Sequence, residues 1–288
     1  MCESGCGKSV SALAILRLIP DPPGRIVGGR VMFGGEDLTR VGVARIRQIR
    51  GNDISMIFQE PMTSQNPMMT IGRQIMEPLR RHRGLGHSRA PRRRMRRWTG
   101  SRFPTPRGGS TGIPHEMSGG MRQRVVIAIA LACDPQVLIA DEPTTALDVT
   151  IQSQILDLIA DLQATTGRAV VMITHDPGVV AETADRVVIM YAGRKVEKAP
   201  VHALFANPRH PYTVGLMRAL LRLDRVATLG FDWRLAAIPG MVPALDAPPQ
   251  GCAFADRCPL VSTRCRQDRP NLEERSPGHI VACWEASG

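Results

Sequence analysis

Composition and charge narrow the class of protein before any motif is considered. The chain has 288 residues, of which 43% are hydrophobic, and this is enough for a sizeable buried core. Its longest apolar runs, such as residues 125–133, are much shorter than a membrane-spanning helix requires. We therefore expect a mostly globular protein that would meet a membrane only through partner proteins.

A glycine-rich turn is the first predicted feature. Residues 5–9, Gly-Cys-Gly-Lys-Ser, match the end of the phosphate-binding pattern G-x-x-x-x-G-K-[ST], and a helix is expected after Lys8. In this pattern, backbone N–H groups and the N-terminus of the helix surround phosphate oxygens. Cys2 stands where the first glycine is usual, and few side chains fit that turn. Because the motif starts at once, we expect no signal peptide.

A strongly basic segment interrupts the chain after two short predicted strands, at residues 30–33 and 56–59. Residues 78–115 contain eleven arginines and no acidic residue, so they account for the formal net charge of +11. Such a segment can be naturally disordered, or can bind nucleic acid or anionic lipid. Trp98 and Phe103 could stack on bases, but with only two aromatics among the arginines nucleic acid is not an expected partner.

Helices and apolar strands alternate beyond this segment. We expect helices over residues 119–133 and 151–164, and buried strands over residues 137–140 and 170–173, with a further strand at 186–190. This alternation predicts an α/β fold with a parallel-sheet core and helices on its faces.

Two acidic residues, Asp141 and Glu142, follow the strand at 137–140. Carboxylates at the carboxyl end of a parallel strand emerge where open α/β sheets bind ligands. A solvated strand end is the alternative interpretation, because Asp-Glu-Pro is a short motif.

The segment that begins the 119–133 helix and the strand that follows this helix carry a family resemblance. Residues 118–124, Ser-Gly-Gly-Met-Arg-Gln-Arg, followed by residues 137–143, Val-Leu-Ile-Ala-Asp-Glu-Pro, resemble the signature and Walker B segments of ATP-binding cassette (ABC) ATPases. The phosphate-binding loop (P-loop), Gln59 of a Q-loop, Asp148 of a D-loop and His175 of a switch occur in the order of that family. The resemblance implies the fold of a P-loop ABC ATPase.

The resemblance also implies ATP and Mg²⁺ as cofactors and a role for each motif. Lys8 would reach the β- and γ-phosphates, Ser9 and Asp141 would hold Mg²⁺, and Glu142 would polarise the attacking water, with His175 as the second catalytic residue. The signature would contact ATP bound to an opposing subunit. The residues expected at ATP or Mg²⁺ are Ser4, Gly5, Cys6, Gly7, Lys8, Ser9, Val10, Gln59 and Asp141, with Ser118, Gly119, Gly120 and Gln123 of the signature and Asp148 of the D-loop.

Two departures from the family pattern raise other hypotheses. Members carry further strands and an adenine-stacking aromatic before the P-loop, so we expect either a true start that lies upstream or a fragment of a once complete gene. They also have an amphipathic helical subdomain where the basic segment lies. Because the flanks at 77–80 and 114–117 look intact, we favour a restored reading-frame shift there. An inactive gene remnant and a non-transport ABC ATPase are the alternative functions.

The C-terminal region indicates a subfamily. Residues 207–213, an amphipathic stretch at 214–223 and residues 62–67 resemble ATPases that drive dipeptide and oligopeptide import. This resemblance implies a second ABC ATPase subunit, two transmembrane permease subunits and an extracytoplasmic peptide-binding protein as partners. It also implies a peripheral position on the cytoplasmic face of the cell membrane.

Four cysteines lie in this region, at positions 252, 258, 265 and 283. Cys252, Cys258, Cys265 and Cys283 have the count for a four-thiolate site, and we favour a structural [4Fe–4S] cluster. Zinc and unliganded thiols are the alternatives, because the spacing departs from C-x-x-C pairs and a reducing cytoplasm disfavours disulfides.

The predicted organisation has four parts. Residues 1–77 form a partial core with the P-loop and Q-loop, and 78–115 are an atypical or disordered segment that replaces most of the helical subdomain. Residues 116–199 carry the signature, Walker B and switch motifs. Residues 200–288 form a small extension with the four cysteines.

Overall fold

The computed structural model describes residues 5–60, 64–84, 112–145, 147–219 and 237–286. The chain divides into two compact units, the first from Ser9 to Ile173 and the second from Met1–Lys8 together with Thr174–Gly288. Each unit has its own sheet and its own hydrophobic core. Residues 85–111, which hold most of the basic segment, lie outside the described residues.

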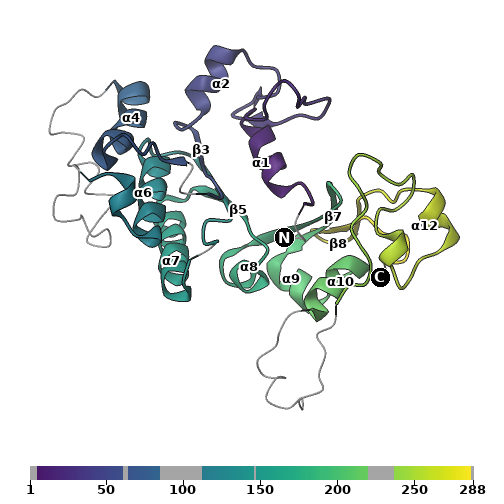
Figure 1. Cartoon of the computed structure of the whole chain (residues 1–288). Helices are drawn as coiled ribbons and strands as arrows, with labels where there is room; N and C mark the ends of the chain where they lie inside the picture. Colours follow the sequence, from purple (N-terminus) through teal and green to yellow (C-terminus); the bar gives the residue numbers. More distant parts are fainter. Residues whose placement is uncertain (1–4, 61–63, 85–111, 146, 220–236, 287–288) are drawn as a thin grey trace. The chain divides into compact units, whose positions relative to one another are not determined.

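The first unit alternates helices with short strands (Figure 1). In chain order its elements are α1 (Lys8–Ile15), β1 (Met32–Phe33), β2 (Glu36–Asp37), α2 (Val43–Ile49), β3 (Ile54–Ile57), α4 (Ile71–Arg83), the 3-10 turn η1 (Pro114–Glu116), α6 (Gly119–Leu131), β4 (Val137–Asp141), α7 (Val149–Thr166) and β5 (Ala169–Ile173).

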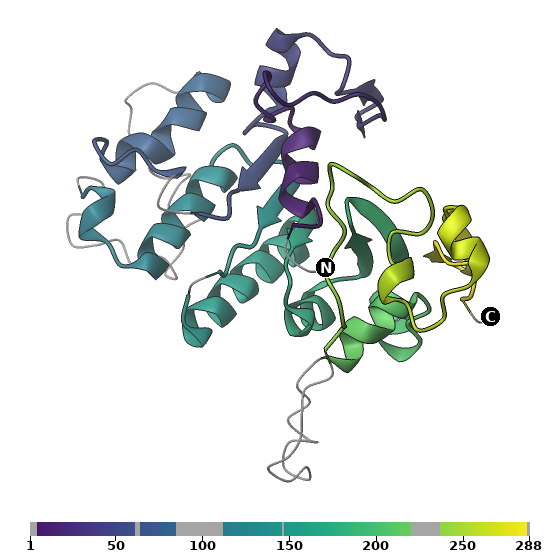
Figure 2. The same ribbon diagram turned by 45° about the vertical axis from the view of Figure 1, so that its right-hand side comes forward.

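A three-stranded parallel sheet, in the order β3-β4-β5, forms the centre of this unit. Strand β4 is almost wholly buried, as its run of Val, Leu, Ile and Ala predicts. Helices α6 and α7 lie beside the sheet (Figures 1 and 2) and pack Ile127, Ile155 and Ile159 against Leu138 and Ala140. The expectation of a buried strand at 170–173 is wrong, because β5 is an edge strand in this sheet. Val171 is exposed, and Val170, Met172 and Ile173 are only half-buried.

Helix α4 belongs to a smaller cluster in the same unit. Ile71 and Ile75 on α4 pack against Val125 on α6. The helix continues through Pro78 to Arg83, so it crosses the predicted domain boundary at residue 78. Arg83 donates from Nη2 to the carbonyl of Cys133 at 2.7 Å, which ties the end of α4 to the end of α6.

The second unit holds the remaining elements. They are α8 (Pro177–Thr183), β6 (Arg186–Tyr191), β7 (Arg194–Pro200), α9 (Val201–Ala206), α10 (Pro211–Arg218), the 3-10 turn η2 (Ala255–Arg257), α12 (Thr263–Gln267), β8 (Glu273–Ser276) and β9 (His279–Val281).

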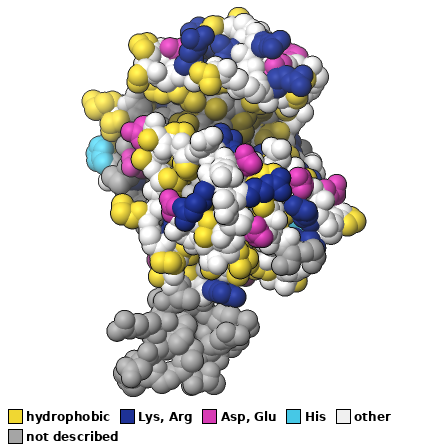
Figure 3. All heavy atoms as spheres, turned by 90° about the vertical axis from the view of Figure 1, so that its right-hand side faces the viewer, with side chains coloured by type: hydrophobic (Ala, Val, Ile, Leu, Met, Phe, Trp, Pro, Cys, Tyr) yellow, Lys and Arg dark blue, Asp and Glu magenta, His cyan; other side chains and the backbone are white. Residues whose placement is uncertain are grey.

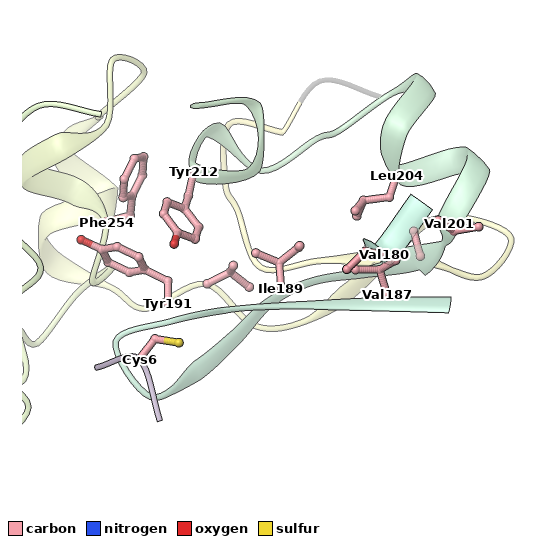
Figure 4. Close-up of a cluster of buried hydrophobic side chains, with 11 residues drawn as sticks. Cys6, Val180, Val187, Ile189, Tyr191, Val201, Leu204, Tyr212 and Phe254 are labelled. Carbon is pink, nitrogen blue, oxygen red and sulfur yellow. The ribbon is translucent and has the colours of Figure 1, made fainter. Parts of the chain in front are cut away.

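An antiparallel sheet in the order β6-β7-β9-β8 organises this unit. The hairpin β8–β9 comes from the end of the chain and pairs with β7, so the C-terminal extension completes a sheet that begins before it. The core beside it contains Ile189 and three aromatic residues, Tyr191, Tyr212 and Phe254, whose rings lie close together (Figure 4). Tyr191 and Phe254 meet edge to face, with ring centroids 5.2 Å apart.

The carboxylate of Glu197 on β7 is fully buried inside this unit. It accepts hydrogen bonds from the backbone N–H groups of Arg209 and His210 at 2.8 and 3.1 Å, and contacts the His279 ring at 2.6 Å. These contacts join β7, the segment before α10 and β9. A buried charge needs such partners, so the extension and the sheet depend on each other for stability.

Composition gives an expectation for two features, membrane spans and surface charge. Among the described residues, no helix is both long and apolar enough to cross a membrane. On the face drawn in Figure 3, basic and acidic side chains are interspersed. This agrees with the sequence, in which the positive excess lies within residues 78–115.

Candidate nucleotide-binding site

A hydroxyl and a carboxylate meet at the carboxyl end of β4. Asp141, the last residue of β4, is 3% exposed, and Ser9 near the start of α1 donates from Oγ to Asp141 Oδ1 at 3.1 Å. The two residues are 132 positions apart and both belong to the first unit. Oxygen ligands of this kind suit Mg²⁺, which prefers hydroxyl, carboxylate and phosphate oxygens. The structure therefore brings together the two residues predicted to hold the metal.

Glu142 has an unusual backbone and specific side-chain partners. Its φ of 46° places a non-glycine residue in the left-handed region, and its N–H donates to the carbonyl of Ile173 at 2.9 Å. The side chain accepts at Oε2 from Gln59 Nε2 and from Thr145 Oγ1, both at 3.0 Å. Strained residues held by their surroundings cluster at functional sites. The predicted Q-loop amide and the predicted water-activating acid are thus in direct contact.

Thr145 was not singled out by the sequence. It lies three residues after Glu142, on the turn that Pro143 begins, and its hydroxyl reaches back to the carboxylate. A hydroxyl residue three positions after an acid in a proline-containing turn is the only signal that could have indicated it.

The signature residues begin helix α6. Ser118 caps the helix by accepting from the N–H of Met121 at 3.4 Å, and it is exposed, as is Gly119. An ideal Cβ on Gly120 would lie 2.9 Å from Ile151 Cγ2, so α6 and α7 approach too closely there for a side chain. Gln123 is buried and donates from Nε2 to the carbonyl of Pro143 at 2.6 Å.

These contacts link the signature helix to the acid pair. The Gln123 bond holds the residue that follows Glu142, so α6 and the turn after β4 are held together. The D-loop residue Asp148 caps α7 by accepting from Ile151 N–H at 2.9 Å. In the structure, Ser118 and Asp148 therefore act as helix caps.

The P-loop lies mostly in the second unit. Gly5 and Gly7 have φ values of 78° and 92°, which the turn requires, and Lys8 begins α1. Cys6 is 2% exposed, and its carbonyl accepts from the N–H of Gly193 at 3.0 Å. The remaining predicted residues of this segment are Ser4, which lies outside the described residues, and Val10, whose side chain is 57% exposed.

His175 belongs to the second unit and follows β5 by two residues. It is exposed, and Asp176 beside it caps α8 by accepting from Gly178 N–H at 2.8 Å. The position at a strand end agrees with the prediction, and its switch role stays a prediction.

The four cysteines of the extension share one small cavity. All are free thiols, and together with His210 and Phe254 they line the same pocket. Burial raises the pKa of Cys252 and Cys258, and raises the pKa of Cys283 to about 11, so these thiols stay protonated without a cation nearby. As the side chains stand in the described residues, no group of three His, Cys, Asp or Glu has an arrangement that could hold a metal ion.

Comparison with known proteins agrees with this geometry. The family model described as "ABC transporter" matches residues 1–145. The model described as "Oligopeptide/dipeptide transporter, C-terminal region" matches residues 196–265. Among solved structures, the ATP-binding cassette MJ0796 is similar; it was solved as a dimer in a post-hydrolysis state bound to ADP and Pi. The match covers 70% of this chain and 83% of the MJ0796 chain, with a TM-score of 0.61 and 27% sequence identity.

Curated relatives are similar over almost the whole chain. A "Probable peptide ABC transporter ATP-binding protein" of Sinorhizobium fredii is 52% identical over 99% of this chain and 84% of its own. A "Putative peptide import ATP-binding protein" of Brucella melitensis is 50% identical over 98% and 86%. The "Dipeptide transport ATP-binding protein DppD" of Escherichia coli is 46% identical over 98% and 84%.

The chain belongs to the ABC transporter ATP-binding proteins, a family of ATPases that use ATP with Mg²⁺. Within that family, its C-terminal region is the one found in oligopeptide and dipeptide transporters. The predicted fold class is confirmed, and so is the family.

Proposed function

We propose that this protein hydrolyses ATP to energise the import of dipeptides or oligopeptides through an ABC transporter. The observation that carries the proposal is the pair of contacts at the end of β4, Ser9 with Asp141 and Gln59 with Glu142. They support the proposal because Asp141, for which we propose metal binding, and Glu142, for which we propose water activation, are neighbours with specific side-chain partners. The match of residues 196–265 and the names of the relatives support peptides as the solute class.

We propose a separate role for each group of residues at the site. The backbone N–H groups of the P-loop and Lys8 bind the phosphates, and Ser9 and Asp141 hold the metal. Bound Mg²⁺ would neutralise charge that develops on the transferred phosphate. Glu142 orients the attacking water, and its bonds to Gln59 and Thr145 fix the direction of its carboxylate. For His175 we propose the role of second catalytic residue, on the strength of its motif position alone.

We expect this ATPase to have several protein partners. The exposed N-terminus of α6 would bind the γ-phosphate of ATP on a second ABC ATPase subunit, so activity requires a homodimer or heterodimer. Two transmembrane permease subunits and an extracytoplasmic peptide-binding protein would complete the importer. The protein would therefore lie on the cytoplasmic face of the membrane, and nucleic acid is not an expected partner.

Peptide uptake tests this proposal. The chain is expressed with the permease subunits and binding protein of a dipeptide importer that lacks the matching ATPase, and entry of a labelled dipeptide is measured. We expect uptake with the wild type and with Glu182→Gln, an exposed acid on α8, and none with Glu142→Gln. Uptake by Glu142→Gln at the wild-type rate would contradict the assigned role. Assembly without uptake or nucleotide binding would favour the inactive remnant.

The four cysteines are proposed as a cluster site. Their shared cavity and free thiols support a [4Fe–4S] cluster, with zinc or unliganded thiols as alternatives. Binding would require thiolates and a rearrangement of the side chains, because the described residues contain no group of three such ligands arranged to hold a metal ion.

Metal analysis after anaerobic purification separates these alternatives. Iron, sulfide and visible absorption that disappear in Cys265→Ser, but remain in the buried control Cys133→Ser, are the expected result. A colourless protein without iron or zinc would exclude both metals.

A further inference from the structure

The P-loop touches the tip of a hairpin far along the chain. Gly193, in the turn between β6 and β7, donates its N–H to the carbonyl of Cys6 at 3.0 Å. An ideal Cβ on Gly7 would lie 3.5 Å from Gly193 Cα, so the two backbones are in close contact. Figure 4 shows Cys6 beside the turn end of the hairpin. All of these residues belong to the second unit.

The turn itself has a geometry that few sequences allow. Ala192 and Gly193 have φ values of 44° and 75°, and Tyr191 pairs with Arg194 across them. Positive φ at both central residues is the pattern of a type I′ hairpin turn, which twists with its strands. Such a turn is stiff, so it can hold the N–H of Gly193 at one place against the P-loop.

Residues of the C-terminal extension also contact this turn. Arg257 is 8% exposed and donates from Nη1 to the hydroxyl of Tyr191 at 3.2 Å. It also donates to the carbonyls of Pro239 at 2.8 Å and Ile238 at 3.1 Å, so the guanidinium is fixed at three points. Leu245 lies against Gly193, with its Cδ2 3.9 Å from an ideal Cβ there.

We propose that the Ala192-Gly193 turn positions the P-loop for nucleotide binding, and that the C-terminal extension keeps the turn in place through Arg257. Gly193 and Arg257 are positioning residues, since neither is among the groups assigned to ATP. Phe254, which contacts the Tyr191 ring, also lines the cysteine cavity. The extension is therefore a structural support of the nucleotide site as well as the carrier of the thiols. The inference rests on the proposed nucleotide site.

Glycine substitutions test the turn. Gly193→Ala forces an alanine to φ 75°, while Gly278→Ala imposes the same strain at φ 72° in the β8–β9 turn. Each new Cβ meets only ordinary contacts, at 3.9 and 3.8 Å. The two variants should lose similar stability, but only Gly193→Ala should weaken MgATP binding, by about three- to tenfold. Gly193→Asn should stay near the wild type, because asparagine tolerates this conformation.

Arginine substitutions test the extension. Arg257→Gln removes the contact with Tyr191, whereas the control Arg269→Gln removes a bond to the carbonyl of Pro249 elsewhere in the extension. Amide hydrogen exchange is measured without nucleotide on peptides covering residues 5–9 and 190–195. Both peptides should exchange faster in Gly193→Ala and Arg257→Gln, and at the wild-type rate in the two controls.

Amide hydrogen exchange, measured without nucleotide, tests this inference independently of the proposed function. A wild type that does not bind MgATP would overturn the proposed function, while the exchange rates would still decide whether the turn holds the loop. Unchanged exchange of residues 5–9 in Gly193→Ala and Arg257→Gln would overturn the inference. Equal acceleration in Gly278→Ala would do the same, since the effect would then be general loss of stability.

Discussion

His210 should make the stability of the second unit depend on pH. Its side chain is 1% exposed, and Nδ1 accepts from the N–H of Tyr212 at 3.1 Å, which caps α10. Burial lowers the pKa of His210 to about 4, although nearby Glu197 and a hydrogen bond with the backbone of Ala282 oppose this shift. In the unfolded chain the pKa returns to about 6.5. The unfolded state therefore binds a proton between these values that the folded state does not.

The sign and size of the effect follow from this difference. The contribution of His210 to the free energy of unfolding is fully present above pH 6.5. It is lost as the pH falls toward 4, because only the unfolded state gains a proton in this range. Between pH 7 and pH 5 the loss in unfolding free energy assigned to this one group is about 2 kcal/mol. Acidification would therefore weaken the second unit, to which His210 belongs.

Urea unfolding followed by circular dichroism measures this loss. His210→Asn keeps an acceptor for the Tyr212 N–H but cannot titrate, so it should lose about 2 kcal/mol less than the wild type between pH 7 and pH 5. The exposed His202→Asn serves as the control and should follow the wild type. An equal loss in the wild type and His210→Asn would refute the reasoning.

Two further predictions concern the site. Glu142→Gln should still bind ATP but release phosphate about 10²- to 10³-fold more slowly and accumulate as an ATP-bound dimer, which phosphate-release and sedimentation assays check; undiminished turnover would disprove its role. Gly120→Ala should destabilise the protein by about 1–3 kcal/mol, because its Cβ would lie 2.9 Å from Ile151, and Ile151→Ala should restore part of the loss in thermal unfolding. No recovery in that double mutant would show that the cost arises elsewhere.

The local parts of the site could be predicted from the sequence. An unbroken apolar run from Val137 to Ala140 favours a buried strand, and acids that follow such a strand are expected at the sheet edge. The serine before Gly119 is likewise a strong start signal for a helix. These inferences depend on residues close together in the chain.

The non-local parts could not be predicted in this way. The bond between Gln59 and Glu142 joins residues 83 positions apart, and the strained φ of Glu142 depends on its N–H reaching Ile173. Strand β5 has the composition of a buried strand, yet its place at the sheet edge exposes it. The pairing of β9 with β7, and the support of the P-loop by Gly193, also depend on contacts that no periodicity encodes.

MgATP binding by the chain and its Lys8→Ala variant tests the central claim most directly. Titration calorimetry should show binding by the wild type and by Lys195→Ala, an exposed lysine on β7, and a loss in Lys8→Ala of at least about tenfold in affinity. This result would establish that the P-loop of this chain binds nucleotide. Equal binding by the wild type and Lys8→Ala, or none by either, would contradict the account of this protein as an ATP-driven subunit.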